Sequence, residues 1–222
     1  MQDMGMPIDR ALNVRDINLT PAELLAILEH KRQMTSAGNR PVTLEEAMTH
    51  FILHFRMNWL KDKHQRDNRD QLQEIERHKY FRSQNEGRDI GKAMAAEEWC
   101  ARYASIWRAE RESLERNGFL TISVVVASEY GLHTRPDSML AEMCRQFDSE
   151  VYLHRQDMTY YNFLLQGRPY LNVSSIIGLL TVDAVQGELL EFIATGPDAK
   201  PALETIAHYI RIGSPLERAM PG

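Results

Sequence analysis

The residues with the most evident chemistry form the string Gly131-Leu132-His133-Thr134-Arg135-Pro136. A β-branched segment, residues 121–126, precedes this string, and a helical pattern, residues 136–147, follows it. His133 therefore lies where a strand gives way to a helix, and the free N–H groups and dipole of a helix start favour an anion. Arg135 adds charge-assisted hydrogen bonds for phosphate oxygens. The string predicts a phosphoryl-binding site, although His-x-Arg-Pro alone also occurs in ordinary loops.

The chain is long enough for two modest globular domains. It has 222 residues, of which 43% are hydrophobic, and a formal net charge of -5. This charge gives no default expectation of a nucleic-acid binder or a polybasic membrane binder. The 2 cysteines are too few and too distant in sequence to indicate a disulfide framework, and no segment is long and apolar enough to cross a bilayer. We therefore expect a soluble cytoplasmic protein.

A domain boundary is expected at Asn117-Gly118, which has the residue types of a helix C-cap and precedes the β-branched run. Charge changes at the same point. Residues 1–118 hold 19 basic and 19 acidic side chains, whereas residues 119–222 hold 7 basic and 12 acidic ones. The sequence thus predicts a helical domain over residues 1–118 and a second domain over residues 119–222.

The first half has the pattern of helices. Two capping boxes, at residues 20–23 and 43–46, each begin with Thr and carry Glu three residues later. Over residues 43–60, apolar side chains recur at helical spacing on both sides of the expected helix. One neighbouring helix would leave part of that surface uncovered, so we expect a homodimer through this domain, with a bundle inside one chain as the alternative.

The second half alternates between the period of strands and that of helices. Strands are predicted near residues 120–127, 151–154 and 189–195, and helices near residues 136–147, 176–180 and 200–211. The order suits an antiparallel sheet covered by helices, which makes the whole chain α+β.

Three separated blocks of this half resemble HPr, the histidine-containing phosphocarrier of the bacterial phosphoenolpyruvate-dependent sugar phosphotransferase system. The blocks are Gly131 to Pro136, the run Leu171-Asn172-Val173-Ser174-Ser175-Ile176-Ile177, and Gly187 with Gly196-Pro197-Asp198 and Ala202. They occur in the family's order, and the likeness covers residues 119–212. The resemblance implies an HPr-like open-faced β-sandwich, and we expect no cofactor.

The same resemblance implies roles for individual residues. His133 would accept a phosphoryl group from enzyme I, with Arg135 and the backbone of Thr134 and Arg135 cradling the phosphate. Ser175 falls at the family's regulatory serine, although a serine in front of a helical run is first of all an N-cap. Three apolar residues match the patch that the family presents to enzyme I, with core packing as the alternative: Ile176, Ile177 and Leu180.

Two features depart from the family. Asp137 adds a negative charge beside the candidate histidine, where the family usually has a small apolar residue. Residues 155–165 lengthen the path from His133 to Ser175 and carry two tyrosines and a phenylalanine. We expect this segment to form an extended hairpin packed on its own domain, with an exposed contact surface as the alternative.

Glu46, His50 and His54 recur at i, i+4 and i+8, so they share one face of a helix in the first half. His-x-x-x-His can bind a metal, but the sequence identifies no further ligand, and a solvated or interfacial face explains the same spacing. We therefore expect no metal site and keep these three residues as a weak candidate. A metal-dependent enzyme with a phosphocarrier appendage would depend on them.

The sequence as a whole predicts a bacterial phosphocarrier rather than a self-contained enzyme. It would accept a phosphoryl group from an enzyme I-like donor on His133 and relay it to a sugar-transport or regulatory acceptor protein. The alternative is a regulatory interaction protein that uses the fold for docking, with transfer vestigial, and both Asp137 and the extra domain favour it. No nucleic acid and no membrane insertion are expected.

Overall fold

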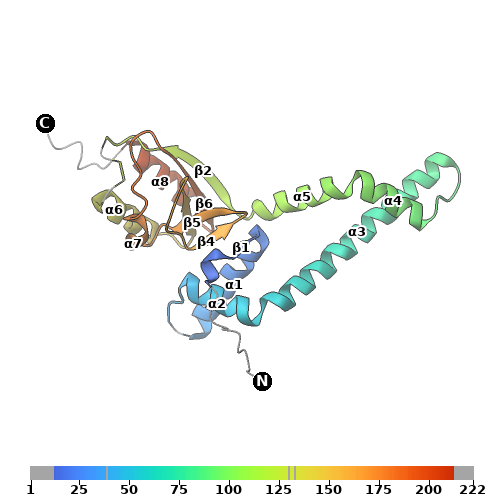
Figure 1. The fold of residues 1–222 in the computed structure, drawn as a ribbon, viewed down its shortest axis with the longest axis horizontal. Coiled ribbons are helices and arrows are strands. Elements are labelled where there is room, and N and C mark those ends of the chain that lie inside the picture. The colour runs from blue at the N-terminus through green and yellow to red at the C-terminus, as the bar shows by residue number, and fades with distance from the viewer. Residues whose placement is uncertain (1–12, 39, 130, 133, 213–222) are drawn as a thin grey trace, which may run out of the picture.

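The computed structural model describes residues 13–38, 40–129, 131–132 and 134–212 (Figure 1). Its elements, in chain order, are η1 (Val14–Asp16), β1 (Asn18–Leu19), α1 (Pro21–Gly38), α2 (Leu44–His54), α3 (Arg56–Glu86), α4 (Lys92–Arg102), α5 (Ala104–Arg116), β2 (Leu120–Val125), α6 (Thr134–Cys144), β3 (Glu150–His154), β4 (Phe163–Leu165), β5 (Arg168–Asn172), α7 (Ile176–Leu179), β6 (Leu189–Thr195) and α8 (Ala199–Ile212). The predicted α+β class is confirmed. No helix in the described ranges is long and apolar enough to cross a membrane.

The strands form one 6-stranded sheet in the order β1-β4-β5-β3-β6-β2. Neighbouring strands are antiparallel except β1 and β4, which are parallel with Asn18 opposite Leu164. The hairpin expected within residues 155–165 is found only in part: the segment contributes β4 alone, which pairs with β5 with Phe163 opposite Tyr170. The segment also does not pack on its own domain alone, because Phe163 lies in the core shared with α1 and α2. The sequence pattern did not indicate β1, whose two residues are too few to show a period.

One face of the sheet carries the core of the C-terminal half. Side chains alternate along a strand, so Val151 and Leu153 of β3 and Phe192 of β6 point to this face, where α6, α7 and α8 pack. Leu140 of α6 and Leu179 of α7 are fully buried there. The helix-covered sheet predicted from the sequence is confirmed.

The second face of the sheet is covered as well, and its cover comes from the N-terminal half. Four residues that point to this face are buried against α1 and α2: Tyr152, Phe163, Tyr170 and Ile193. The rings of Tyr152 and Phe163 meet edge to face with centroids 4.9 Å apart. Leaving so many aromatic side chains in water would cost free energy. The sheet face that an open-faced sandwich would leave exposed is therefore covered over these residues by α1 and α2.

A buried carboxylate joins α1 to α3. Glu23 is 3% exposed, and its side chain accepts hydrogen bonds from the backbone N–H and hydroxyl of Thr20. Its other oxygen lies 2.9 Å from Nε of Arg56, at the start of α3. The capping box predicted at residues 20–23 therefore also sets the direction in which α3 leaves the N-terminal core.

The helix predicted over residues 43–60 is interrupted at Phe55, where α2 ends and α3 begins. Helix α3 has 31 residues and no buried side chain, and it returns toward the sheet through α4 and α5 (Figure 1). Ion pairs connect the outgoing and returning helices, including Lys63 to Glu115 at 2.7 Å and Arg82 to Glu98 at 3.1 Å. We call α3, α4 and α5 the helical arm. The arm also has a small apolar core around α4, where Ala95 and Trp99 are buried, and the ion pairs add to it.

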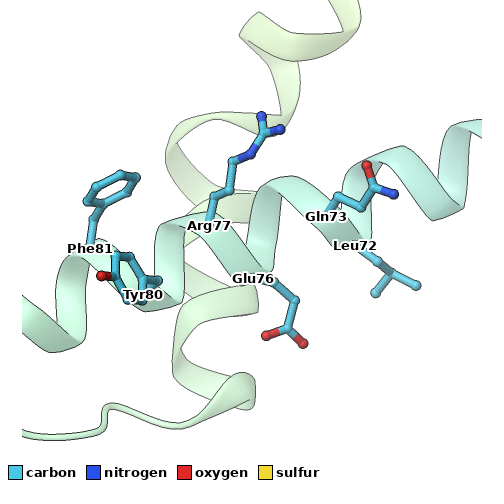
Figure 2. A pocket seen from close by; sticks show the side chains of 6 residues that line it. All are labelled: Leu72, Gln73, Glu76, Arg77, Tyr80 and Phe81. Carbon is cyan, nitrogen blue, oxygen red and sulfur yellow. The ribbon is translucent and has the colours of Figure 1, made fainter.

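The covered face predicts a difference between two phenylalanines. Phe163 is fully buried under α1 and α2, whereas Phe81 projects from α3 and is 61% exposed (Figure 2). We expect Phe163→Ala to lower the free energy of unfolding by about 3–5 kcal/mol, since it leaves a cavity between the sheet and its cover. Phe81→Ala, the matched control, should change it by less than about 0.5 kcal/mol. Urea unfolding of both variants would measure this, and equal costs would mean that the second face is not closed.

Candidate functional site

The loop that leads to His133 is held against the segment in front of β6. Leu132 is buried in the C-terminal core, and its backbone N–H donates to the carbonyl of Ala184 at 2.8 Å. Gly131 adopts φ 68°, and a Cβ at this position would lie 2.3 Å from the same carbonyl oxygen. Only glycine fits such a positive φ and so close an approach. The residue just before the candidate histidine is thus fixed in both backbone and side chain.

Helix α6 begins at Thr134, immediately after this fixed point. Thr134 and Arg135 are therefore in the first turn, where backbone N–H groups have no partner within the helix and where the helix dipole favours an anion. His133 itself lies outside the described residues, and Arg135 is placed here by its backbone alone. This local geometry matches the strand-to-helix junction predicted from the sequence.

The segment that holds Gly131 and Leu132 is in turn braced by an ion pair. Arg155 donates to both carboxylate oxygens of Glu188, at 2.8 and 3.0 Å, and to the carbonyl of Val182 at 2.8 Å. Glu188 also accepts from the backbone N–H of Val185 at 3.0 Å. The hydrogen bond from Arg155, reinforced by that of Val185, holds the pKa of Glu188 below its ordinary value. Sequence reasoning missed this brace, because its two charged residues are 33 positions apart.

Ser175 is the N-cap of α7, as a serine in front of a helical run predicts. Its hydroxyl accepts from the backbone N–H of Gly178 at 3.2 Å. Of the three candidate docking residues, Ile177 is 75% exposed and Leu180 is 45% exposed, whereas Ile176 is partly buried against the core. The structure therefore presents two of them on the surface and uses the third partly for packing.

The last matching block forms the start of α8. The Asp198 carboxylate accepts from the backbone N–H of Asp148 and from the hydroxyl of Ser149, and the hydrogen bond from Ser149 is the main cause that lowers the pKa of Asp198. Gly196, with φ 137°, lets the turn pass so close to Ser149 that a Cβ would lie 2.5 Å from its hydroxyl oxygen. These residues shape the turn that leads from β6 into α8.

The metal candidate of the N-terminal half is used for structure. Glu46 closes the capping box with Thr43 and pairs with Arg40 at 3.3 Å. His50 forms a hydrogen bond of 2.8 Å with His30 of α1, a partner that the sequence did not indicate. Within the part of the chain that the structure describes, no group of three or more His, Cys, Asp or Glu side chains is arranged to hold a metal ion.

Cys144, at the end of α6, is poorly suited to act as a nucleophile. It is 2% exposed, and burial raises the pKa of its thiol to about 12. A thiol with so high a pKa stays protonated near neutral pH and does not react as a thiolate.

Comparison with known proteins matches the C-terminal half. A family model described as the PTS HPr component phosphorylation site matches residues 120–211. The multiphosphoryl transfer protein of Salmonella typhimurium is 35% identical over 94 residues, which are 42% of this chain and 23% of that protein. The phosphocarrier protein NPr of Escherichia coli strain K12 is 31% identical over 91 residues, which cover 41% of this chain and 90% of NPr.

Among solved structures, phosphocarrier protein HPr of Bacillus anthracis is similar with a TM-score of 0.36 and 22% identity. The match covers 41% of this chain and 96% of that protein. This chain thus spans almost the whole length of the small phosphocarriers, but 23% of the length of the multiphosphoryl transfer protein.

The close contact at Gly131 predicts a specific cost for adding one methyl group. Gly131→Ala combines a strained positive φ with a clash against the Ala184 carbonyl, so we expect it to lower the free energy of unfolding by about 3 kcal/mol. Gly167→Ala is the control, because Gly167 has φ 78° but a Cβ added there would meet no atom within 4 Å, and about 1 kcal/mol is expected. Chemical unfolding would compare the two, and equal costs would contradict the packed loop.

Proposed function

Because this chain belongs to the HPr family of phosphotransferase-system phosphocarriers, we propose that His133 is its phosphoryl-accepting residue, that the donor is an enzyme I-like protein, and that the phosphoryl group is then relayed to a second protein. The observation that carries the proposal is the position of His133 between the fixed residue Leu132 and the first turn of α6. Its place within the matched residues 120–211 supports the same assignment.

The transfer forms one bond and breaks another. A neutral imidazole nitrogen of His133 attacks the phosphorus atom, a nitrogen–phosphorus bond forms, and the bond from phosphorus to the donor's leaving group breaks. The relay reverses these roles, with His133 as the leaving group. A helix start next to an arginine would stabilise the phosphoryl anion once it is on the imidazole.

Two charged residues of the first turn would tune this transfer. Arg135 carries a permanent positive charge and can donate two hydrogen bonds to phosphate oxygens. Asp137 places a negative charge in the same turn, which suits the helix dipole but opposes an incoming phosphoryl group. We propose that Arg135 promotes transfer and that Asp137 moderates its rate or its choice of partner.

The surface around α7 would dock partner proteins. Ile177 and Leu180 are exposed, and Ile176 supports them from the core. Ser175 would serve as a regulatory phosphorylation site in addition to its role as N-cap, because a phosphate there would repel an acidic partner surface. Sugar-transport or regulatory proteins are the proposed acceptors.

The N-terminal half adds functions beyond phosphoryl transfer. We propose that residues 1–118 form a helical module for oligomerisation, signal input or choice of partner, joined to a carrier unit over residues 119–222. The corner between α2 and α3 exposes Leu53, Phe55 and Met57, which supports self-association through this module. A cytoplasmic location is part of the same proposal.

The first test replaces the acceptor. With phosphoenolpyruvate and enzyme I, the full chain should gain an acid-labile, base-stable phosphate, and His133→Ala should abolish it because no imidazole remains in front of α6. His208→Ala, on the exposed side of α8, is the control and should label like the unchanged chain. The intact mass of the unchanged chain and of both variants after incubation measures the phosphate gained by each. Labelling of His133→Ala at the unchanged level would refute the assignment.

The second test separates charge from geometry at Arg135. Arg135→Ala should slow phosphorylation about 10- to 100-fold, which corresponds to losing about 1.5–3 kcal/mol from a charge-assisted hydrogen bond. Arg135→Lys should recover part of the rate, because it restores the charge without the planar pair of donors. The melting temperature should stay nearly unchanged in both variants. Unaltered single-turnover kinetics for Arg135→Ala would remove this residue from the transfer step.

A further inference from the structure

The cover that α1 and α2 place on the second sheet face stops before the end that carries the candidate loop. Val125 and Leu189 are opposite each other on β2 and β6. Each alternates with a residue buried in the C-terminal core, so both point to the face that α1 and α2 cover. Yet Val125 is 51% and Leu189 is 61% exposed, while Ile193, farther along β6, is buried beneath the cover.

A third exposed apolar residue comes from the turn before β6. Val185 is 52% exposed, and the turn that follows it is bonded to the end of β2 through Val126, which donates to Glu188 and accepts from Gly187, both at 2.9 Å. We call Val125, Val185 and Leu189 the strand-end patch.

The strand-end patch is continuous with the candidate site. The Cα of Val185 lies 3.2 Å from the position of a Cβ on Gly131, two residues before His133. Strand β2 also leads directly from Val125 into the loop that ends at His133. A protein that contacts Val185 therefore lies beside the segment that leads to His133.

Exposure of three large aliphatic side chains beside a reactive loop needs a reason, because contiguous apolar surface on a soluble domain usually marks an interaction site. Positive charge on this half would not attract a partner in place of apolar contact, because residues 119–222 carry 7 basic and 12 acidic side chains. Ile177 lies on α7 and Leu180 is the C-cap of that helix, which packs on the opposite face of the sheet. This half of the chain thus exposes apolar side chains on both faces of its sheet.

We propose that the strand-end patch is a second docking surface for the protein that delivers the phosphoryl group to His133, which would seat aliphatic or aromatic side chains on it. The inference rests on the proposed function. A donor that contacts both the α7 residues and the strand-end patch straddles the loop and excludes water from the transfer site on two sides. The N-terminal cover limits the donor to this open end of the face.

The test uses the full chain and the steady-state kinetics of phosphorylation by enzyme I and phosphoenolpyruvate. Val185→Ser combined with Leu189→Thr should raise the KM for the chain about tenfold and change kcat less than about twofold, the pattern of lost binding. Its melting temperature should be unchanged, because both side chains are exposed. The control is Leu120→Thr, which alters a similarly exposed side chain at the far end of β2 and should keep the original KM.

The outcomes separate the two proposals. Efficient phosphorylation of the unchanged chain together with an unaltered KM for the double variant overturns the docking surface and leaves the phosphocarrier function standing. The same unaltered KM with a shift from dimer to monomer in sedimentation would assign the patch to a second copy of this chain, which also overturns the proposal. An unchanged chain that enzyme I does not phosphorylate at all would refute the proposed function.

Discussion

The rest of the structure depends on the need to cover a second apolar face of the sheet. Tyr152, Phe163, Tyr170 and Ile193 present aromatic and aliphatic surface on the side opposite α6 and α8. Leaving that surface in water would cost several kcal/mol, because each large side chain contributes roughly 1.5–3 kcal/mol on burial. Helices α1 and α2 supply the cover, and the short strand β1 adds a parallel edge to the sheet beside them.

This cover makes the N-terminal half part of the same hydrophobic core as the strands. The charge pattern and the change of period place a boundary near residue 118, but side chains of α1 contact the sheet beyond it, and Lys31 of α1 pairs with Glu150 of β3. Strands β3 and β6 consequently hold one core on each face. A change in how α1 and α2 pack would reach these strands directly, and with them the segment before β6 that supports the His133 loop.

The candidate site is organised by contacts between distant parts of the chain. Gly131 and Leu132 rest on Ala184, and the segment around Ala184 is braced by Arg155 and Glu188. In the function proposed above, the backbone N–H groups at the start of α6 would meet an arriving phosphoryl group from a direction that these contacts fix. The helical arm lies apart from these contacts. Helix α3 buries no side chain and extends away from the sheet.

The sequence by itself determined the elements that have a strong local signal. The β-branched run at 121–126 predicted a strand because such side chains suit an extended backbone, and Thr with Glu three residues later predicted the starts of α1 and α2 because these side chains satisfy free N–H groups. The order Gly-Leu-His-Thr-Arg-Pro placed His133 at a helix start for the same kind of local reason. Only the tertiary structure decided what covers the second face, where Phe55 breaks a regular helical pattern, and which distant residues hold Gly131 and leave Val125 and Leu189 open. Those outcomes depend on contacts between residues far apart in the chain, and the periodicity of a single segment carries no information about its partners.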